Sequence, residues 1–460
     1  MIRATAVLAL LCALCSPADS APPRNVLLLI GDDLGRQLGG YGDPDAMTPN
    51  IDRLAAEGVR FSHAFAAVSS CSPSRSTIYT GQFVHTNGQY GLAHAAHHGR
   101  THEGIKSIPS YLNEAGYRTG IIAKLHVEPA SVYPFTDNLG GEGRNVSDLA
   151  ARARKFFADC GEKPFFLAIG YTDPHRGKQG FDNGENRPGV VPAVFDPAKL
   201  AVPGFLPDLP EVREDLADYH QSVNRLDQGV GMILKVLEES GQAGRTLVIF
   251  LSDNGLPFPG GKTELYDPGI HLPLIVRSPP GTKRGIVNAA MVSWVDLLPT
   301  VLDWAGVKPP KGLPGRSFLP VLEQEKPEGW DEIHASHIYH EIPMYYPMRA
   351  VRTRTHKLIR NLAHELPAPV ASDLTKGASW QAIWKRRVTH LGGRTMDAYV
   401  HRPLEELYDL DKDPLETKNL AADPASAAVL ADLRRRMETW REATKDPWLE
   451  KERLDADARR

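Results

Sequence analysis

The sequence predicts an α/β protein: a large N-terminal domain in which helices flank a mostly parallel central sheet, followed by a smaller C-terminal α+β domain. Three observations support this prediction. Short apolar runs typical of buried parallel strands alternate with stretches of helical periodicity. Polar residues follow these runs, at the edge where ligands bind in such a sheet. From about residue 336 the chain is Pro- and Arg-rich in places, so we expect the two domains at residues 21–335 and 336–460.

The first apolar run, residues 25–30, predicts a strand that ends beside Asp32 and Asp33. A helix is expected next, with Thr48 as its cap and Gly58 at its end. Three later strands also end beside polar side chains. They are residues 119–123 before Lys124 and His126, residues 164–169 before Asp173 and His175, and residues 246–251 before Asp253 and Asn254.

The remaining segments complete the expected architecture. The longest helical pattern covers residues 210–240 and stops at Gly241. In the C-terminal domain, residues 348–359 contain short alternating runs. A final helix, capped at Asp423, has one apolar face, and we expect the charged stretch after Trp448 to fray. That face consists of Leu430, Leu433, Met437 and Trp440.

Composition and charge exclude some classes of protein. The chain has 460 residues, of which 42% are hydrophobic and 24% charged, as in an ordinary globular protein of about two to four domains. A net charge of -3 gives no overall field for nucleic acid or for an anionic membrane. We therefore expect neither partner; a homodimer is compatible with the sequence.

Residues 1–20 predict a signal peptide. Arg3 precedes an apolar run at residues 4–15, and residues 18–20 fit a cleavage site of small residues. The run is too short to span a bilayer. We expect an exported protein, periplasmic or secreted, or lysosomal if the host is an animal.

Hard oxygen donors follow two of the expected strands. Asp32, Asp33, Asp253 and Asn254 offer three carboxylates and an amide, which suit Ca²⁺ or Mg²⁺ better than zinc. Spacing alone does not establish that the two pairs meet.

Cys71 precedes a predicted helix start. Ser72 can cap a helix with Pro73 at its first position, so Cys71 would lie just outside a helix N-terminus, where an anion is favoured. Arg75 lies one turn further on. A buried cysteine beside an ordinary helix is the alternative, and the residues alone leave both open. If Cys71 does chemistry, Cys160 is a buried structural thiol.

A longer motif around this cysteine resembles the signature of a known family. Cys71-x-Pro73-Ser74-Arg75-x-x-x-x-Thr80-Gly81 is similar to the sulfatase signature, and residues 31–33 and 252–255 match in the order that the family requires. The chain is identified as a member of the sulfatase family. The resemblance implies an alkaline-phosphatase-like fold and a Cys71 that a formylglycine-generating enzyme oxidises to formylglycine. It also implies Ca²⁺, or Mg²⁺, held by Asp32, Asp33, Cys71, Asp253 and Asn254.

Within the family, the chain is most similar to the sulfamidase branch, which cleaves the N-sulfate of glucosamine. The similar segments are residues 69–75, 120–126, 173–176, 227–231, 252–259, 346–349 and 446–448. Lys262 stands where that branch has arginine, and the later cysteine pairs of the animal enzyme are missing, which suggests a bacterial relative. The resemblance implies hydrolysis of N-sulfoglucosamine at the end of heparan-type glycans. The alternatives are a sugar O-sulfatase, a phosphomonoester or phosphonate hydrolase, and a non-catalytic binder of sulfated glycans.

The resemblance also implies catalytic roles. The hydrated formylglycine acts as a gem-diol nucleophile, which Arg75 steadies. Lys124 and Lys262 bind sulfate oxygens. We assign His175 to the leaving group and His126 to the diol.

Further residues are candidates for binding the substrate. Asp173 is expected to orient or bind it. A dense histidine segment, residues 85–102, is interpreted as a pocket loop; its spacing fits no zinc motif, and a plain surface loop is the alternative. The remaining candidates are His97, His98, His340, Glu341 and Arg349.

Overall fold

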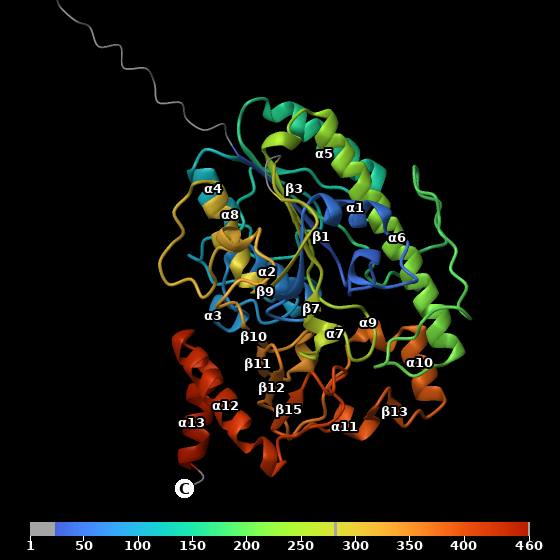
Figure 1. The fold of residues 1–460 in the computed structure, drawn as a ribbon, viewed down its shortest axis with the longest axis vertical. Coiled ribbons are helices and arrows are strands. Elements are labelled where there is room, and N and C mark those ends of the chain that lie inside the picture. The colour runs from blue at the N-terminus through green and yellow to red at the C-terminus, as the bar shows by residue number, and fades with distance from the viewer. Residues whose placement is uncertain (1–23, 280–282, 459–460) are drawn as a thin grey trace, which may run out of the picture.

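The computed structural model describes residues 24–279 and 283–458. The expected signal peptide lies outside these residues. Figure 1 shows a large body built around a central sheet, with a smaller C-terminal part packed against one end of it. No helix within the described residues has the length and apolar character needed to cross a membrane.

The central sheet has nine strands, and the four strands expected from the sequence are its consecutive neighbours β3, β5, β1 and β6. These four pair in parallel, as does β4 beside β3, which confirms the mostly parallel sheet. In sheet order the strands are β4 (Asp137–Asn138), β3 (Arg118–Ala123), β5 (Phe165–Gly170), β1 (Asn25–Gly31), β6 (Thr246–Ser252), β8 (Leu274–Arg277), β2 (Val59–Phe65) and β7 (His271–Leu272), with β9 (Ile286–Ser293) also paired to β2.

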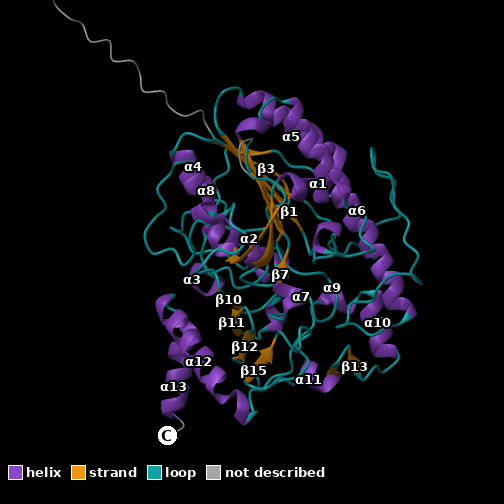
Figure 2. Cartoon of the chain, in the orientation of Figure 1, coloured by secondary structure: helices purple, strands orange, loops and turns teal. Residues whose placement is uncertain are grey.

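Helices cover both faces of this sheet (Figure 2). Alternate residues of β1 point to opposite faces, so Leu27 and Leu29 join one core and Leu28 and Ile30 the other. The first core is covered by α1 (Pro49–Glu57), α5 (Val146–Cys160) and α6 (Pro210–Glu239), and the second by α2 (Cys71–Thr80), α4 (Ile108–Glu114) and α8 (Leu297–Trp304). Burial of the apolar residues on both faces positions the strand ends that carry the polar side chains.

The C-terminal part is built on an antiparallel sheet of four strands, which confirms the expected α+β domain. Its strands are β10 (Glu332–His337), β11 (Met348–Thr353), β12 (His356–Asn361) and β15 (Glu405–Asp409). Helix α12 (Ala427–Ala443) buries its predicted apolar face against Leu358 and Leu407 of this sheet. The sheet begins at Glu332, so the expected boundary between residues 335 and 336 falls inside β10.

Short elements connect these layers. They are α3 (Val84–Asn87), α7 (Asp267–Ile270), α9 (Ser372–Thr375), α10 (Ala378–Lys385), α11 (Met396–Val400), β13 (His390–Leu391), β14 (Arg394–Thr395) and the 3₁₀ helices η1 (Gly39–Tyr41), η2 (Ala95–His97), η3 (Ala243–Arg245), η4 (Trp294–Asp296), η5 (Leu319–Val321), η6 (Ile342–Met344) and η7 (Pro424–Ser426). The stretch that was expected to fray forms α13 (Pro447–Ala458) instead. Arg441 at the end of α12 pairs with Glu452 of α13, an ion pair between two helices that composition does not reveal.

Cys160 is buried at the end of α5 and forms no disulfide with any residue that the structure describes, as predicted for a structural thiol.

Candidate active site

The polar residues after β1 and β6 meet at the carboxyl edge of the sheet. Gly31 and Ser252 are register partners, so the residues that follow them lie side by side. The main-chain N–H of Asp33 donates to Asp253 Oδ1 over 3.1 Å, and the N–H of Asp253 donates to the carbonyl of Gly31 over 3.1 Å. The parallel register therefore brings together the two pairs of oxygen donors that the sequence separates by about 220 residues.

Helix α2 brings Cys71 to this edge, but it starts earlier than the sequence suggests. Cys71 is its first residue and Ser70 its cap, whereas Ser72 and Pro73 were expected there. Pro73 is tolerated because N–H groups of the first helical turn have no partner within the helix. The Ser72 hydroxyl is used elsewhere, since it accepts from the N–H of Ala93 over 3.1 Å.

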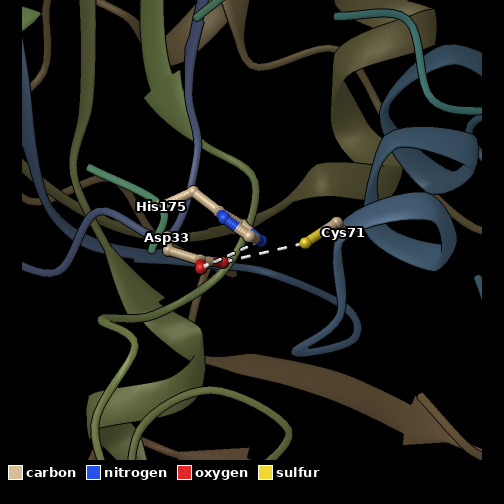
Figure 3. A group of neighbouring side chains, drawn as sticks. All are labelled: Asp33, Cys71 and His175. Atoms are coloured by element: carbon tan, nitrogen blue, oxygen red, sulfur yellow. Dashed lines mark hydrogen bonds and ion pairs between the residues drawn. The ribbon is translucent and has the colours of Figure 1, made fainter. Parts of the chain in front are cut away.

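The thiol of Cys71 points into the carboxylate cluster and is only 1% exposed. Its Sγ lies 3.7 Å from Asp33 Oδ1 and 3.7 Å from Asn254 Nδ2. Burial raises the pKa of this thiol well above its usual value, although Lys262 and Lys124 oppose the effect. Figure 3 shows Cys71 facing Asp33 and His175, whose donor atoms all lie within 4.8 Å of one another.

The oxygen donors fit a divalent cation. Asp32 Oδ1 and Asn254 Oδ1 are buried and accept no hydrogen bond from the residues that the structure describes. Buried oxygens of this kind are costly unless something binds them. Donor atoms of Asp32, Cys71 and Asp253 lie within 4.8 Å of one another, close enough to share an ion. The donors are mainly hard oxygens, which suit Ca²⁺ or Mg²⁺.

Three cations surround the carboxylates. Lys262 Nζ donates to Asp33 Oδ2 over 2.8 Å, Arg75 Nε donates to Asp253 Oδ2 over 2.8 Å, and Lys124 Nζ donates to Asp32. Lys262 and Arg75 are fully buried. Burial opposes ionisation of Asp32, yet Lys124 and the other nearby cations hold its pKa well below the usual range. The cluster therefore holds fixed positive charge beside the carboxylates, the kind of charge that can stabilise an anionic group.

Two predicted histidines lie at this edge in different surroundings. His175 Nδ1 donates to the carbonyl of Arg176 over 2.5 Å, and its Nε2 faces Asp33 Oδ2 at 3.8 Å. His126 Nε2 lies 2.6 Å from Nδ1 of His94, which the sequence did not single out within the histidine segment. Asp33 and His126 both have a φ of 62°, a conformation that is uncommon for residues with a side chain and is found at functional sites.

Asp373 of α9 also reaches this cluster, and no signal in the sequence indicated it. Its Oδ2 accepts from Lys262 Nζ over 2.6 Å and lies 3.8 Å from His175 Nε2. The residue follows no predicted strand and belongs to no recognised motif. Only the packing of the C-terminal part against the main domain brings it here.

Two predicted substrate-binding residues from the C-terminal part support the site from behind. His340 Nδ1 lies 2.8 Å from the hydroxyl of Ser70, so it fixes the start of α2. The carboxylate of Glu341 accepts from both the hydroxyl and the N–H of Ser372, at 2.5 and 3.2 Å. Both side chains thus contact other protein groups, and these contacts position Ser70 and Ser372, which lie next to the cluster.

Asp173 and Arg349 lie differently from what the sequence suggested. The carboxylate of Asp173 is fully buried and accepts from Arg225, Arg144 and Ser222, which leaves no free face for a substrate. Its main-chain carbonyl accepts from the N–H of Asp32 over 3.0 Å. Arg349 is also fully buried and forms a two-pronged pair with Asp446 at 2.8 Å. Because buried charges need partners, both residues act as structural anchors.

The other two candidates, His97 and His98, belong to the histidine segment and lie near the surface of the protein. His97 is partly exposed, and its Nδ1 accepts from the N–H of Ile342 over 3.2 Å. His98 is exposed, at the end of η2. His97 packs edge-on against His94, so this loop adjoins His126.

A cavity of about 920 Å³ lies elsewhere, between the two sheets and α12. It is lined by Phe83, Trp330 and Trp440 among others, and by none of the predicted site residues. Cavity size alone therefore does not locate the chemistry.

The fold and the cluster at its sheet edge define a hydrolase of the sulfatase class, and comparison with known proteins agrees. Residues 24–307 match the Sulfatase family model, and residues 261–367 match the model described as N-sulphoglucosamine sulphohydrolase, C-terminal. The chain belongs to the sulfatase family.

Particular relatives are similar over most of the chain. It is 41% identical to N-sulphoglucosamine sulphohydrolase of Homo sapiens, over 93% of this chain and 92% of the human enzyme. It is 28% identical to an ulvan-active sulfatase of Formosa agariphila, over 94% of this chain and 82% of that protein. Among solved structures, a protein in complex with its substrate D-glucosamine-2-N,6-O-disulfate shares the fold, with a TM-score of 0.68 at 21% identity, covering 92% of this chain and 98% of that one.

Proposed function

We propose that this enzyme hydrolyses the sulfamate bond of N-sulfoglucosamine at the end of heparan-type glycans and releases sulfate. The observation that carries the proposal is the 41% identity to the human sulphohydrolase, which extends over both parts of the chain. The C-terminal match includes Lys262 and the strands of the second sheet up to β12. The residues of the site from the main domain and those from the C-terminal part thus both lie in a chain that resembles the same enzyme along most of its length.

The proposal includes the conversion of Cys71 to formylglycine by a modifying enzyme. A hydrated aldehyde at this position supplies one hydroxyl that attacks sulfur and a second that allows sulfate to be expelled. The placement of Cys71 at the first position of α2, among Asp33, Asn254 and Lys262, supports this role.

A divalent cation, with Ca²⁺ as our first choice, completes the site. Asp32, Asp33, Asp253 and Asn254 would hold it, with the converted residue 71. When bound, it polarises the sulfuryl group as a Lewis acid. Lys124 and Lys262 would bind sulfate oxygens, and Lys262 also keeps its pair with Asp373.

The histidines divide the proton transfers. The departing nitrogen needs a proton, and His175 Nε2 faces the space between Asp33 and Cys71, where that nitrogen would lie. His126, held by His94, serves the diol. Arg75 forms ion pairs with Asp32 and Asp253 and so balances part of their negative charge.

The enzyme is further proposed to act outside the cytoplasm after export by the signal peptide. A second candidate function is a sugar O-sulfatase, because the substrate in the similar solved complex carries a 6-O-sulfate as well as an N-sulfate.

The test is sulfate release from N-sulfoglucosamine and from glucosamine 6-O-sulfate, measured side by side. The protein is produced together with a formylglycine-generating enzyme and supplied with Ca²⁺, and mass spectrometry establishes that Cys71 is converted. We expect release from the N-sulfated sugar, and none from either substrate with the Cys71→Ala variant. Release from the ester alone would replace the sulfamidase function by the O-sulfatase function. No release by the converted enzyme from either sugar would contradict both.

A further inference from the structure

Asp373 has no role in the proposed mechanism, although it touches two of its residues. It lies in α9, in the C-terminal part, more than 100 residues from Lys262. Its Oδ2 is 2.6 Å from Lys262 Nζ and 3.8 Å from His175 Nε2, and its side chain is 21% exposed. The carboxylate of Asp373 therefore borders the site, and its partial exposure leaves it accessible to a ligand.

The position of this carboxylate is fixed by its neighbours. Glu341 binds the N–H and the hydroxyl of Ser372, which precedes Asp373 in α9. The other oxygen, Asp373 Oδ1, accepts from the N–H of Leu374 over 2.9 Å. Burial opposes ionisation of Asp373, yet Lys262, His340 and His175 hold its pKa well below the usual range. The side chain is thus an oriented anion with Oδ2 facing Lys262 and His175.

The leaving atom of the substrate must come close to this anion. A proton donor works within about 3 Å of the atom that it protonates. If His175 Nε2 serves the leaving atom, that atom lies no more than about 7 Å from Asp373 Oδ2, which is itself 3.8 Å from the same nitrogen. Lys262 does not cancel the charge of Asp373 completely, because its single ammonium is shared with Asp33.

The two substrate classes differ in the charge that develops at this atom. In a sulfamate the S–N bond breaks, sulfur gains an oxygen that derives from water, and the nitrogen takes up protons to leave as an amine. Near pH 6 that amine is a cation, since comparable amino groups titrate near pH 8. In an ester the S–O bond breaks, and the oxygen takes one proton and leaves as a neutral alcohol. A carboxylate next to the leaving atom stabilises the first product and not the second.

We propose that Asp373 is a specificity-determining residue that favours sulfamates over sulfate esters by stabilising the positive charge on the departing nitrogen. The inference rests on the proposed function. It gives the C-terminal part a direct share in substrate choice.

The first experiment compares kcat/KM for N-sulfoglucosamine and glucosamine 6-O-sulfate at pH 6 in wild type, Asp373→Asn and Asp373→Glu. For Asp373→Asn we expect kcat/KM for the sulfamate to fall about 10- to 100-fold, mainly in kcat, with a change of no more than about 3-fold for the ester. Asp373→Glu should recover part of the selectivity. The control is Asp397→Asn, which removes an exposed carboxylate from the same part of the chain and should leave both values unchanged.

An equal fall for both substrates would overturn the inference, because Asp373 would then only position Lys262. No change for either substrate would overturn it as well. A wild-type enzyme that is active only on the ester would contradict the proposed function itself, and the wild-type assay shows this independently of the variants.

A second measurement uses the wild type and does not depend on the folding of a variant. Glucosamine, a cationic product, and glucose, its neutral analogue, are compared as inhibitors of the reaction at pH 6. We expect glucosamine to inhibit at least about 10-fold more strongly, as a close charge pair in a partly buried site would give. Equal inhibition by the two sugars would contradict a carboxylate that senses the charge of the amine.

Discussion

Two buried oxygens, Asp32 Oδ1 and Asn254 Oδ1, show how the single residues of this site are arranged. Each is enclosed and accepts no hydrogen bond within the described part of the chain. Asp32, Asp33 and Asp253 are fully buried, and their countercharges among the described residues are the cations of the cluster. Burial, followed by repulsion from Asp32, raises the pKa of Asp253 to about 7. Such a cluster lowers the stability of the fold until a cation binds it.

Ca²⁺ should therefore stabilise the protein before any catalysis. With Cys71→Ala, which cannot be converted, we expect the unfolding temperature to rise on addition of Ca²⁺ and to fall back with EDTA. A concentration 100 times the Kd corresponds to about 2.7 kcal/mol of stabilisation. Differential scanning calorimetry measures the shift without an activity assay.

Paired variants show which residues bind the cation. Asp32→Asn in the same background should lose most of the Ca²⁺ shift, because it removes one charged donor. Asp411→Asn, at an exposed carboxylate, should keep it. If the Asp32→Asn protein still shifted fully, the cation site would lie elsewhere.

At the scale of elements, the site depends on how closely β3 and β5 approach at their ends. A Cβ on Gly170 would lie 2.0 Å from the carbonyl oxygen of Lys124 and 2.9 Å from Arg75 Nη1. The same two segments are joined by the N–H of Lys124, which donates to the carbonyl of Gly170 over 3.0 Å. The absence of a side chain at Gly170 therefore lets Lys124 and Arg75 take their places in the site.

Gly170→Ala should move both cations and destabilise the fold. We expect a loss of about 1–3 kcal/mol in the free energy of unfolding, typical of overpacking, together with a fall in kcat. Urea denaturation and the sulfate-release assay measure the two effects. Gly244→Ala is the matched control, because no atom lies within 4 Å of its added Cβ. Equal stability of the two variants would contradict this account of Gly170.

Helices α12 and α13 are joined to β11 by a cluster around Asp446. Its carboxylate accepts from Arg349 at 2.8 Å and from Arg441 Nε at 2.7 Å. Burial opposes its ionisation, but Arg349 and Arg441 hold its pKa well below the usual range. A carboxylate with a lowered pKa stabilises the fold above its unfolded pKa, near 3.9, and loses that contribution as the pH falls toward the folded pKa.

Asp446→Asn should thus be much less stable than wild type at pH 7, by about 3–5 kcal/mol, since it leaves the buried Arg349 without its paired carboxylate. The difference should narrow as the pH falls below about 4, because Asp446 then takes up a proton in the unfolded chain while it keeps its charge in the folded one. Unfolding curves at a series of pH values test this. The exposed Asp411→Asn control should follow wild type throughout, and a difference that stays constant down to pH 2 would rule out the Asp446 charge as its cause.

At the scale of the whole molecule, the two parts share their cores. One cluster joins Phe65, Tyr266 and Met291 of the main domain with Ala350 and Tyr408 of the second sheet. Another joins Phe83 and Val295 to the strands and α12. Separating the parts would expose both clusters to water, so each part would lose apolar burial that it has in the whole molecule.

We therefore expect the described chain to unfold in a single cooperative transition. Far-UV circular dichroism and tryptophan fluorescence should give coincident curves, and the calorimetric and van't Hoff enthalpies should agree. A chain that ends at residue 331 should be insoluble or unfolded. Two well-separated transitions, or a soluble and folded short chain, would show that the parts are independent.

The sequence by itself determined the elements and the chemistry that follows them. Apolar runs located β1, β3, β5 and β6, because burial on both faces of a parallel strand leaves a local pattern. Parallel order then predicted that Asp32, Asp33, Asp253 and Asn254 share an edge, and the motif around Cys71 indicated the family. These inferences needed only neighbouring residues and the general geometry of a parallel sheet.

Only the tertiary structure decided which side chains line the cluster around Cys71. Asp373 gave no local signal, and the histidine segment did not reveal that His94 contacts His126, because these partners lie far away in the sequence. Asp173 and Arg349 were candidates because they lie in family motifs. In the structure, however, Asp173 is bound by arginines and Arg349 is paired with Asp446. Helix α2 begins at Cys71 rather than at the expected Pro73, and its cap Ser70 contacts His340, which lies 270 residues further along the chain. The physical reason is the same in each case: a side chain's role depends on the groups that packing places around it, and those groups are not its neighbours in the chain.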